Sequence, residues 1–418
     1  MTYQEAKDFL FQQLPMFERN GAADYKPGLS TISRLAEWLD KPHCRFRSIH
    51  VAGTNGKGSV SHSLAAILQQ MGFRVGLFTS PHLVDFRERI RVNGQPVDEN
   101  YVADFVERYR QSSLGRNPDF NPTFFELTTA LAFNYFAESK VQWAVIETGL
   151  GGRLDSTNII VPQLSVITNI SLDHTSLLGH TLAEIASEKA GIIKPGVPVV
   201  IGEAEDETRP VFEQAARAVG APIVFAEEMD KTAGIYESEL QGAFQLRNTN
   251  TVACAMHVLF DCFVRQGLKH VCELTGLHGR WETLRQRPLV ICDTGHNPGA
   301  WQYLGPQVAA VQCRQRRVVF GMVADKDVEN VVGRLPKDAI YYLTQPSSHR
   351  AKPVQELREL AIAKGLTCPH IYNNVCDAYQ AALGDSAPDD FIFVGGSSYL
   401  VGDLLASCQV NGTTGSVR

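Results

Sequence analysis

Short apolar runs alternate with stretches of helical periodicity along the first half of the chain. The pattern predicts buried strands within 48–52, 74–82, 141–148, 164–170 and 197–201. It predicts helices over 3–19, 31–40, 98–111, 125–138 and 182–192, and another after the turn at 53–58. Strands that alternate with helices favour an α/β fold in which helices cover both faces of a parallel sheet.

A second alternation begins near residue 289 and predicts a smaller α/β domain. Strands are expected at 289–293, 317–322, 339–343 and 391–396, and a helix is expected at 248–266. Residues 203–245 are less regular, and residues 411–416 have the composition of a frayed tail. Because 418 residues are too many for one ordinary core, we expect two domains, over 1–284 and 288–418.

A glycine-rich turn follows the first apolar run and reads Gly53-Thr-Asn-Gly-Lys-Gly-Ser59. Strand, turn and helix in this order are the context of a phosphate-binding loop, in which glycines let backbone N–H groups converge on phosphate oxygens. Lys57 supplies a positive charge, and Ser59 supplies a hydroxyl for a phosphate or its magnesium ion. The standard pattern has no glycine between the lysine and the hydroxyl, so a glycine-rich turn with an exposed lysine is the alternative.

Three polar residues follow other predicted strands, namely Ser80, Glu147 and His174. Ligands bind at the carboxyl ends of the strands in such sheets, so these residues are expected beside the phosphate loop. Oxygen ligands favour magnesium, and one imidazole among them is tolerated. The alternatives are an ion pair between Glu147 and Arg153 and a structural role for His174.

Two further features have both a structural and a functional interpretation. Lys189 stands on an otherwise apolar helix, where the structural alternative is an ordinary amine that reaches the surface. Asp293, His296 and Asn297 crowd one turn after a strand of the second domain. That turn is either a helix-capping loop that starts at Asn297 or a ligand site, and three polar groups at a strand end favour the ligand site.

Composition and charge narrow the class of protein. The chain is 44% hydrophobic and 20% charged, as globular proteins are, and its net charge of −6 argues against nucleic acid as the main partner. The nine cysteines form no Cys-x-x-Cys pair, which favours reduced and mostly buried thiols. No apolar run is long enough to span a bilayer, and Glu5, Lys7 and Asp8 stand where a signal peptide would be apolar. We therefore expect a cytoplasmic protein that binds no membrane.

A set of motifs occurs in a fixed order along nearly the whole chain. They are His50-Val-Ala-Gly-Thr-Asn-Gly-Lys-Gly-Ser59, Thr79-Ser-Pro-His-Leu83, Glu147-Thr-Gly-Leu-Gly-Gly-Arg-Leu-Asp-Ser-Thr-Asn158, Leu172-Asp-His-Thr175, Glu188-Lys-Ala-Gly-Ile192, Asp293-Thr-Gly-His-Asn-Pro298 and Asp325-Lys-Asp327. Together they resemble folylpolyglutamate synthase/dihydrofolate synthase, a branch of the Mur ligase superfamily. The resemblance implies a P-loop-containing ATPase domain of the Mur ligase type, followed by a smaller Rossmann-like domain.

The resemblance also implies an ATP-dependent amide ligase. A pterin-bearing carboxylate attacks the γ-phosphate of ATP, and the amine of L-glutamate displaces phosphate from the resulting acyl phosphate. The acid is dihydropteroate in one reaction and the γ-carboxylate of a reduced folate, such as tetrahydrofolate, in the other. The implied cofactors are two Mg²⁺ ions and a monovalent cation. We expect a monomer whose two domains close over the acyl phosphate and exclude water.

Site residues are carried over from the family by position. The ATP-binding set is Gly53, Thr54, Asn55, Gly56, Lys57, Gly58, Ser59, Asn248, Arg280 and Asp293. Ser80, Glu147 and His174 would hold magnesium, and Lys189 would be a carbamylated lysine (N6-carboxylysine). The pterin substrate would lie near Gly28, Leu29, Thr123, Phe124, Phe125, Glu126, Gly152, Arg153, Leu154 and Asp155. Asp293, His296 and Ser397 would face glutamate, and the implied catalytic residues are Lys57, His174, Lys189 and His296.

The N-terminal loop departs from the family pattern. It reads Lys26-Pro-Gly-Leu-Ser-Thr31, where many bacterial members have Asp-Leu-Gly-Leu. The nearest alternative is therefore a ligase with only the polyglutamate activity. A ligase acting on a nucleotide-linked muramyl acid is a second alternative, although such enzymes usually carry an extra N-terminal domain. A nucleotide-switched binding protein without ligase chemistry is a third.

Overall fold

The computed structural model describes residues 1–16, 26–229, 237–261, 265–367 and 370–410. The chain divides into two compact units. Unit 1 comprises Met1–His82, Arg87–Glu239 and Gln245–Leu277, and unit 2 comprises Leu83–Phe86, Leu240–Phe244 and His278–Arg418. The chain thus crosses between the units several times, and each unit is described by itself below. The functional division at residues 284 and 288 stays a prediction.

Unit 1 is built on an eight-stranded sheet in its described residues, with the order β4-β3-β2-β5-β1-β6-β7-β8. The strands are β1 Arg47–Ala52, β2 Val75–Phe78, β3 Ile90–Val92, β4 Gln95–Pro96, β5 Trp143–Glu147, β6 Leu164–Ile167, β7 Val199–Ile201 and β8 Ile223–Phe225. Six of them are parallel, whereas β3 and β4 pair antiparallel at one edge. The expected parallel strands are confirmed, and two short antiparallel strands extend the sheet at one edge.

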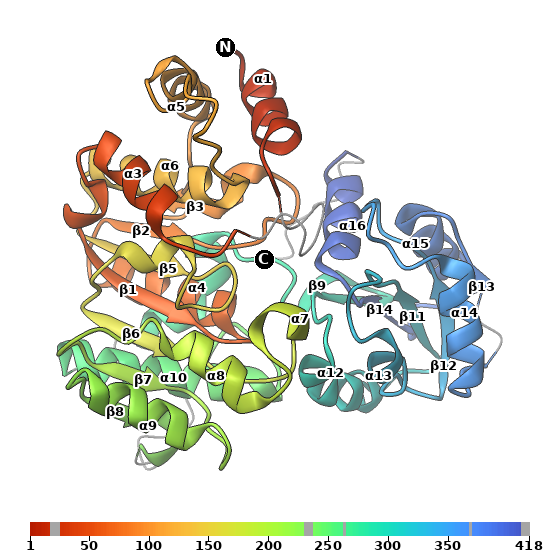
Figure 1. Ribbon diagram of the computed structural model, residues 1–418. Helices are drawn as coiled ribbons and strands as arrows, with labels where there is room; N and C mark the ends of the chain where they lie inside the picture. The colour runs from red at the N-terminus through yellow and green to blue at the C-terminus, as the bar shows by residue number, and fades with distance from the viewer. Residues whose placement is uncertain (17–25, 230–236, 262–264, 368–369, 411–418) are drawn as a thin grey trace. The chain divides into compact units, whose positions relative to one another are not determined.

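Helices cover both faces of this sheet (Figure 1). The α-helices are α1 Tyr3–Asp8, α3 Ser30–Trp38, α4 Lys57–Gln70, α5 Glu99–Gln111, α6 Phe124–Glu138, α7 Thr175–Leu178, α8 Leu182–Ala190, α9 Arg209–Ala218, α10 Ala243–Phe260 and α11 Val271–Thr275. Shorter turns are η1 Phe9–Gln13, η3 Pro42–Cys44, η4 Phe86–Arg89, η5 Ser156–Ile159, η6 Ala226–Glu228 and η8 Arg265–His270. None of the described helices is both long and apolar enough to cross a bilayer.

Alternation along the central strand explains the two layers of helices. Ile49 and Val51 of β1 pack in a core with α4 and α10, whereas Ala52 packs in a second core with α8 and α9. Successive side chains of a strand point to opposite faces, so a strand such as β1 that is buried from Ser48 to Ala52 needs a cover on each side. Polar residues such as His50 are also buried within the strands, and the candidate site lies at the strand ends.

Unit 2 has a six-stranded sheet in its described part, with the order β13-β12-β11-β14-β10-β9. Its strands are β9 Glu282–Gln286, β10 Leu289–Asp293, β11 Arg316–Phe320, β12 Ala339–Leu343, β13 His370–Ile371 and β14 Phe391–Gly395. Its helices are α12 Pro298–Ala310, α13 Val328–Val332, α14 Val354–Ala363, α15 Val375–Gly384 and α16 Ser398–Val410. One apolar core lies on each face, and only β9 runs antiparallel among these strands.

The nine predicted strands are confirmed, and most of them are shorter than predicted, whereas two predicted helices have other bounds than expected. The stretch 203–245, which was hard to place from the sequence, contains α9, which buries Phe212 and Ala216, and β8, a half-buried strand at the edge of the sheet. The first helix changes to a π-helix at Phe9 and ends at Gln13, and residues 17–19 of the prediction lie outside the described residues. The expected helix at 248–266 starts earlier, at Ala243, and residues 262–264 and 411–416 are also outside.

Among the six cysteines whose burial is described, buried thiols are not the majority. Cys254 and Cys292 are buried, whereas Cys44 and Cys376 are exposed and Cys272 and Cys313 are intermediate. All six of these residues are free thiols.

Candidate active site

The glycine-rich turn joins β1 to α4 at the carboxyl edge of the sheet. Gly53 and Gly56 have φ angles of +145° and +83°, which residues with a side chain adopt only with backbone strain. The Nζ of Lys57 donates hydrogen bonds to the carbonyl oxygens of Gly53 (3.0 Å) and Thr54 (3.1 Å). Lys57 is thus half-buried over its own loop rather than exposed, and α4 points its N-terminus at the same place. Converging N–H groups, a lysine and a helix N-terminus suit a phosphate chain.

The segment after β6 braces this loop. The Oδ1 atom of Asn169 accepts a hydrogen bond of 2.9 Å from the backbone N–H of Asn55, and the hydroxyl of Thr168 donates one of 2.6 Å to the Asn55 carbonyl. Ser171 exchanges further hydrogen bonds with Thr54 and Asn55. Sequence reasoning missed these bracing residues, although their place after a strand on the same edge was a usable signal.

Asn248 lies against the turn from α10. A Cβ atom on Gly56 would stand 2.2 Å from the Asn248 Oδ1 atom, so the side chain contacts the loop backbone directly. Asn248 is 7% exposed. The fold therefore brings Asn248, a predicted ATP-binding residue from a distant part of the sequence, to the glycine-rich turn.

Glu147 and Ser80 lie at neighbouring strand ends. In the sheet, Ile146 of β5 is paired with Phe78 of β2, and Glu147 is in register with Val51 of β1. Glu147 is 3% exposed, which is costly for a carboxylate unless a cation or donors compensate. A serine hydroxyl, a carboxylate and phosphate oxygens form a donor set that suits magnesium. No group of three or more His, Cys, Asp and Glu side chains that could hold a metal ion occurs among the described residues.

His174 caps the short helix α7 in a left-handed conformation, with φ of +50°. Its backbone N–H donates a hydrogen bond of 2.9 Å to Asp173 Oδ1. A non-glycine residue with positive φ is uncommon and is often found at functional sites. The structure places it on the segment that continues from the Ser171 brace.

Lys189 is buried beside the phosphate loop. Its side chain is 4% exposed, and its Nζ donates a hydrogen bond of 2.9 Å to the Gly53 carbonyl. Burial, together with the nearby charge of Lys57, lowers the pKa of Lys189 to about 7, although Asp173 and Asp155 oppose the shift. The alternative of a lysine that reaches the surface is therefore wrong.

The loop at residues 149–158 packs against the C-terminus of α8. A Cβ atom on Gly152 would lie 2.9 Å from the carbonyl oxygens of both Glu188 and Lys189, and Arg153 pairs with Glu188 at 2.8 Å. Asp155 is 5% exposed and accepts hydrogen bonds from the backbone of Leu150 (2.8 Å) and Thr157 (3.0 Å). Burial raises its pKa, and these hydrogen bonds oppose the increase. Asp155 therefore organises its own loop.

The segment at residues 121–126 starts α6 with a capping box. The Thr123 hydroxyl accepts a hydrogen bond of 3.2 Å from the Glu126 N–H, and Glu126 Oε2 accepts one of 2.7 Å from the Thr123 N–H. Lys26 donates a hydrogen bond of 3.0 Å to the Asn121 carbonyl, which brings the loop before Gly28 and Leu29 to this segment. Capping explains the sequence pattern without a ligand.

Phe124 and Phe125 are the first two residues of α6, and their rings contact different residues. The guanidinium of Arg89 lies 5.1 Å from the centre of the Phe124 ring. The ring of Phe125 packs 5.8 Å from that of Phe78, and a Cβ atom on Gly149 would lie 2.5 Å from its Cζ atom. Phe125 therefore joins two segments that were expected to bind the pterin.

Unit 2 gathers its predicted residues at the end of β10. Asp293 is 3% exposed and accepts hydrogen bonds from the N–H groups of Trp281 (2.9 Å) and Gly295 (2.8 Å). Burial raises the pKa of Asp293, and Arg280 and His296 oppose the increase. Arg280 donates to the Thr294 hydroxyl, and the Nδ1 atom of His296 lies 3.1 Å from the Thr294 carbonyl. Asn297 caps α12 by accepting from Ala300 N, so the turn is both a cap and a polar cluster.

A second group in unit 2 contains Arg350 and Tyr399, which sequence reasoning missed. Arg350 donates hydrogen bonds to Asp325 (2.9 Å) and to the Tyr399 hydroxyl (3.2 Å). Ser397, which is 1% exposed, accepts a hydrogen bond of 3.2 Å from the Tyr399 N–H. The signal was the Asp325-Lys-Asp327 motif, whose arginine partner is distant in sequence. The structure thus gathers Ser397 and this motif in one cluster.

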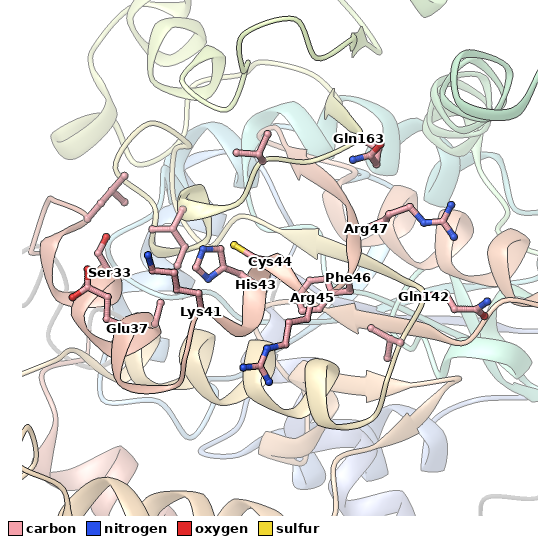
Figure 2. A pocket seen from close by; sticks show the side chains of 15 residues that line it. Ser33, Glu37, Lys41, His43, Cys44, Arg45, Phe46, Arg47, Gln142 and Gln163 are labelled. Carbon is pink, nitrogen blue, oxygen red and sulfur yellow. The ribbon is translucent and has the colours of Figure 1, made fainter.

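A cavity of about 980 Å³ lies on the opposite edge of the unit 1 sheet, near the starts of β1, β5 and β6 (Figure 2). Its lining includes Leu29 and the basic residues Lys41, Arg45 and Arg47. Arg45 pairs with Asp40, and the Arg47 guanidinium lies 4.7 Å from the Trp143 ring centre, so the two arginines point apart. Apart from Leu29, none of the predicted site residues lines this cavity.

Comparison with known proteins places the chain among ligases. Residues 51–260 match the family model described as the Mur ligase middle domain, and residues 279–398 match that of the Mur ligase, glutamate ligase domain. The chain is 32% identical over 446 residues to the dihydrofolate synthase/folylpolyglutamate synthase of Bacillus subtilis, covering 96% of this chain and 98% of the relative. It is 33% identical over 432 residues to the Haloferax volcanii protein named "Probable bifunctional folylpolyglutamate synthase/dihydropteroate synthase", but it spans only 50% of that relative's length.

Solved structures agree with these similarities. Escherichia coli FolC in complex with DHPP and ADP superposes with a TM-score of 0.85 and 27% identity over 99% of both chains. The bifunctional folylpolyglutamate synthase/dihydrofolate synthase of Yersinia pestis, complexed with AMPPNP and a Mn ion, superposes with a TM-score of 0.83 and 28% identity over 98% of both chains. The two-unit α/β fold is therefore of the Mur ligase type.

Proposed function

Because the chain belongs to the Mur ligase family, in the branch of the dihydrofolate synthases/folylpolyglutamate synthases, we propose that it is an ATP-dependent ligase that attaches L-glutamate to two acids. One is dihydropteroate, which becomes dihydrofolate, and the other is the γ-carboxylate of a reduced folate, which becomes a folylpolyglutamate. The observation that carries the proposal is that the Nζ atoms of Lys57 and Lys189 both donate hydrogen bonds to the carbonyl oxygen of Gly53 in the glycine-rich turn.

The proposed reaction has two steps. A carboxylate oxygen of the acid attacks the γ-phosphorus of ATP, the bond to the bridging oxygen breaks, and ADP leaves. The amine nitrogen of L-glutamate then attacks the acyl carbon, the bond to the phosphate oxygen breaks, inorganic phosphate leaves, and the amine releases its protons to solvent. Both steps depend on positioning and on stabilising charge at phosphate oxygens more than on a strong acid or base.

Residues 53–59 are proposed to hold the phosphate chain of ATP, with Asn248 beside the loop. Lys57 would leave the carbonyls of Gly53 and Thr54 and turn to the outer phosphates, because an anion is a better partner for an ammonium than a neutral carbonyl. Arg280 and Asp293 would contact ATP from unit 2. We propose that ATP is the co-substrate, and the Yersinia pestis complex with AMPPNP supports a nucleotide at this site.

Ser80, Glu147 and His174 would hold a divalent cation, and we propose Mg²⁺, as two ions, with a monovalent cation as a further cofactor. The Mn ion in the Yersinia pestis relative supports a divalent metal. When bound, the metal neutralises phosphate charge and orients the oxygens that react. Glu147 supplies a buried carboxylate whose cost such a cation would offset.

We propose that Lys189 is carbamylated. Its neutral amine would attack carbon dioxide, form a nitrogen–carbon bond and release a proton. A pKa of about 7 leaves much of the amine neutral and therefore nucleophilic at physiological pH. The product is an anion, so the Lys57 ammonium that disfavours a charged Lys189 would favour the carbamate, which could then serve as a metal ligand.

The pterin is proposed to lie among Gly28, Leu29, Thr123, Phe124, Phe125, Glu126, Gly152, Arg153, Leu154 and Asp155. In unit 2, Asp293, His296 and Ser397 are proposed to face glutamate and the reacting carboxylate. We propose accordingly that residues 1–284 form the ATP-binding part, that residues 288–418 form the glutamate-ligase part, and that the protein acts as a cytoplasmic monomer. DHPP in the Escherichia coli FolC complex supports the pteroate substrate.

Phosphate release from ATP tests the proposal. Reactions contain Mg²⁺ and L-glutamate, with dihydropteroate or tetrahydrofolate in separate tubes, and tubes without glutamate are the control. Stimulation by both acids supports the bifunctional enzyme. Stimulation by tetrahydrofolate alone leaves the polyglutamate activity and directs attention to the altered loop at Lys26. Stimulation by neither contradicts the folate substrates.

A further inference from the structure

Gln245 is a buried amide that no part of the proposed chemistry uses. It lies in the first turn of α10 and is 2% exposed. Its Nε2 atom donates a hydrogen bond of 3.1 Å to the hydroxyl oxygen of Ser59, which is itself 1% exposed. An amide from a distant part of the sequence thus reaches the hydroxyl of the phosphate loop.

The orientation of this amide is fixed from its other end. Asn248 Nδ2 donates a hydrogen bond of 2.8 Å to Gln245 Oε1. An amide nitrogen can only donate, so Gln245 presents its oxygen to Asn248 and its nitrogen to Ser59. The Oδ1 atom of Asn248 in turn lies against Gly56. A chain of contacts therefore runs from Gly56 through Asn248 and Gln245 to Ser59, and it closes on the same loop.

The direction of the last hydrogen bond determines what Ser59 can do. Because its oxygen accepts from Gln245, the hydroxyl proton is not needed for that contact and stays available to donate elsewhere. Ser59 is the third residue of α4, where phosphate oxygens are expected. A donor there stabilises an anion, whereas a hydroxyl that donates to the protein would present only its lone pairs.

We propose that Gln245 is a positioning residue for nucleotide binding, which holds the Ser59 hydroxyl as a hydrogen-bond donor toward a phosphate oxygen. The inference rests on the proposed function only in that this loop binds a nucleotide. Gln245 touches no reacting atom and acts through Ser59. It selects for a nucleotide with a phosphate at that position and has no part in choosing the acid or the amino acid.

The test uses the full-length protein and two variants of similar size. Gln245→Met keeps the length of the side chain without donor or acceptor, and Gln245→Glu replaces the donor by an acceptor. Thr251→Val is the matched control, since it removes a buried hydrogen bond of 3.0 Å to the Arg247 carbonyl on the same helix. Calorimetry with ADP, the KM values for ATP, glutamate and dihydropteroate, and the melting temperature are measured for each.

We expect Gln245→Met to weaken ADP binding and raise the KM for ATP about fivefold, the usual effect of one neutral hydrogen bond, with little change in the other two KM values. Gln245→Glu should weaken ADP binding more than Gln245→Met does, because its carboxylate accepts a hydrogen bond from the Ser59 hydroxyl and repels phosphate. Thr251→Val should bind ADP as the wild type does. In a double-mutant cycle, Ser59→Ala should remove most of the effect of Gln245→Met.

Several results would overturn the proposal. Unchanged ADP binding in a folded Gln245→Met protein would do so, as would a Gln245→Glu protein that binds ADP better than Gln245→Met, or additive effects in the cycle. If Gln245→Met does not fold, the folded Gln245→Glu protein decides by the same ADP titration. If the wild type binds ADP but shows no folate-stimulated turnover, the proposed function is contradicted. The ADP titrations of the variants then still decide whether Gln245 positions Ser59. No ADP binding by the wild type would overturn both.

Discussion

Lys189 and Lys57 donate hydrogen bonds to the same acceptor, the carbonyl oxygen of Gly53, at 2.9 and 3.0 Å. Two ammonium groups this close repel each other, and the buried one has the lowered pKa. Conversion of Lys189 to an anionic carbamate would replace this repulsion by attraction. The shared acceptor of the two lysines therefore supports carbamylation of Lys189 more strongly than the burial of Lys189 alone would.

The first prediction is that Lys189 is carbamylated in solution. An ordinary lysine with a pKa of 10.5 is less than about 0.1% neutral at pH 7, whereas a pKa of about 7 leaves about half of the amine neutral. At a fixed concentration of dissolved carbon dioxide, the carbamate should therefore increase as pH rises through 7 and decrease below it. Carbon-13 NMR with labelled bicarbonate should give a carbamate signal in the wild type.

The control for that experiment is Lys194→Arg. Lys194 is half-buried, donates a hydrogen bond of 2.9 Å to the Asn158 carbonyl, and also has a pKa lowered by burial. Its replacement should keep the signal, whereas Lys189→Arg should lose both the signal and ligase turnover. A signal that persists in Lys189→Arg would assign the carbamate elsewhere, and no signal in the wild type would exclude the modification.

The second prediction concerns the metal. Glu147→Gln keeps the size of a buried side chain but removes its charge, so the Mg²⁺ concentration for half-maximal activity should rise about 10- to 100-fold. Ser80→Ala should shift it in the same direction by less, because a hydroxyl is a weaker ligand than a carboxylate. Titration of activity with Mg²⁺ at saturating ATP measures both. Glu138→Gln, on a half-exposed carboxylate that bonds Tyr101, should leave the titration unchanged, and an unshifted Glu147→Gln curve would argue against metal binding at Glu147.

The positions of the main strands along the chain and the residues at their ends could be predicted because the buried strands are short apolar runs separated by stretches of helical periodicity. Ser80 and Glu147 were identified as candidates in this way, whereas Lys189 was singled out on an otherwise apolar helix and given a role by the family resemblance. The structure puts Glu147 and Lys189 in buried positions. The antiparallel strands β3 and β4 were missed because they are three and two residues long, which is too short for a period to emerge.

The braces of the phosphate loop could not be predicted for a different reason. Asn169 and Gln245 carry ordinary polar side chains, and nothing in their local sequence says which group of the loop each will meet. Their contacts span more than 100 residues of sequence, so the tertiary fold alone brings them together. The same applies to Arg350, whose partners Asp325 and Tyr399 stand on different segments.

The third prediction is that Asp155→Asn loosens the substrate loop. Asp155 accepts from Leu150 N with one oxygen and from Thr157 N with the other, and an amide can accept with only one of them. The free energy of unfolding should fall by about 1–3 kcal/mol, the cost of an unsatisfied buried donor. Urea denaturation measures it, and Asp119→Asn, at an exposed position, should have no effect.

The same loop change should appear in the kinetics. The KM for dihydropteroate should rise in Asp155→Asn while the KM for ATP stays near its original value, because the loop is proposed to bind the pterin. Thr157→Val offers a second route to the loop, since it removes the hydroxyl that lies 2.8 Å from the buried His50 Nε2 atom. If both variants are as stable as the wild type, Asp155 does not organise the loop.

The last prediction places the pterin by a steric change. Gly149→Ala would put a methyl group 2.5 Å from the Phe125 Cζ atom, so the ring must move away from the loop. We expect the KM for dihydropteroate to rise about tenfold with little change in the KM for ATP, and the smaller side chain of Phe125→Leu to restore part of the loss in the double variant. Gly384→Ala, where an added methyl group meets no atom within 4 Å, should behave as the wild type. Equal increases in both KM values would mean that the ring supports the whole sheet edge and not a pterin subsite.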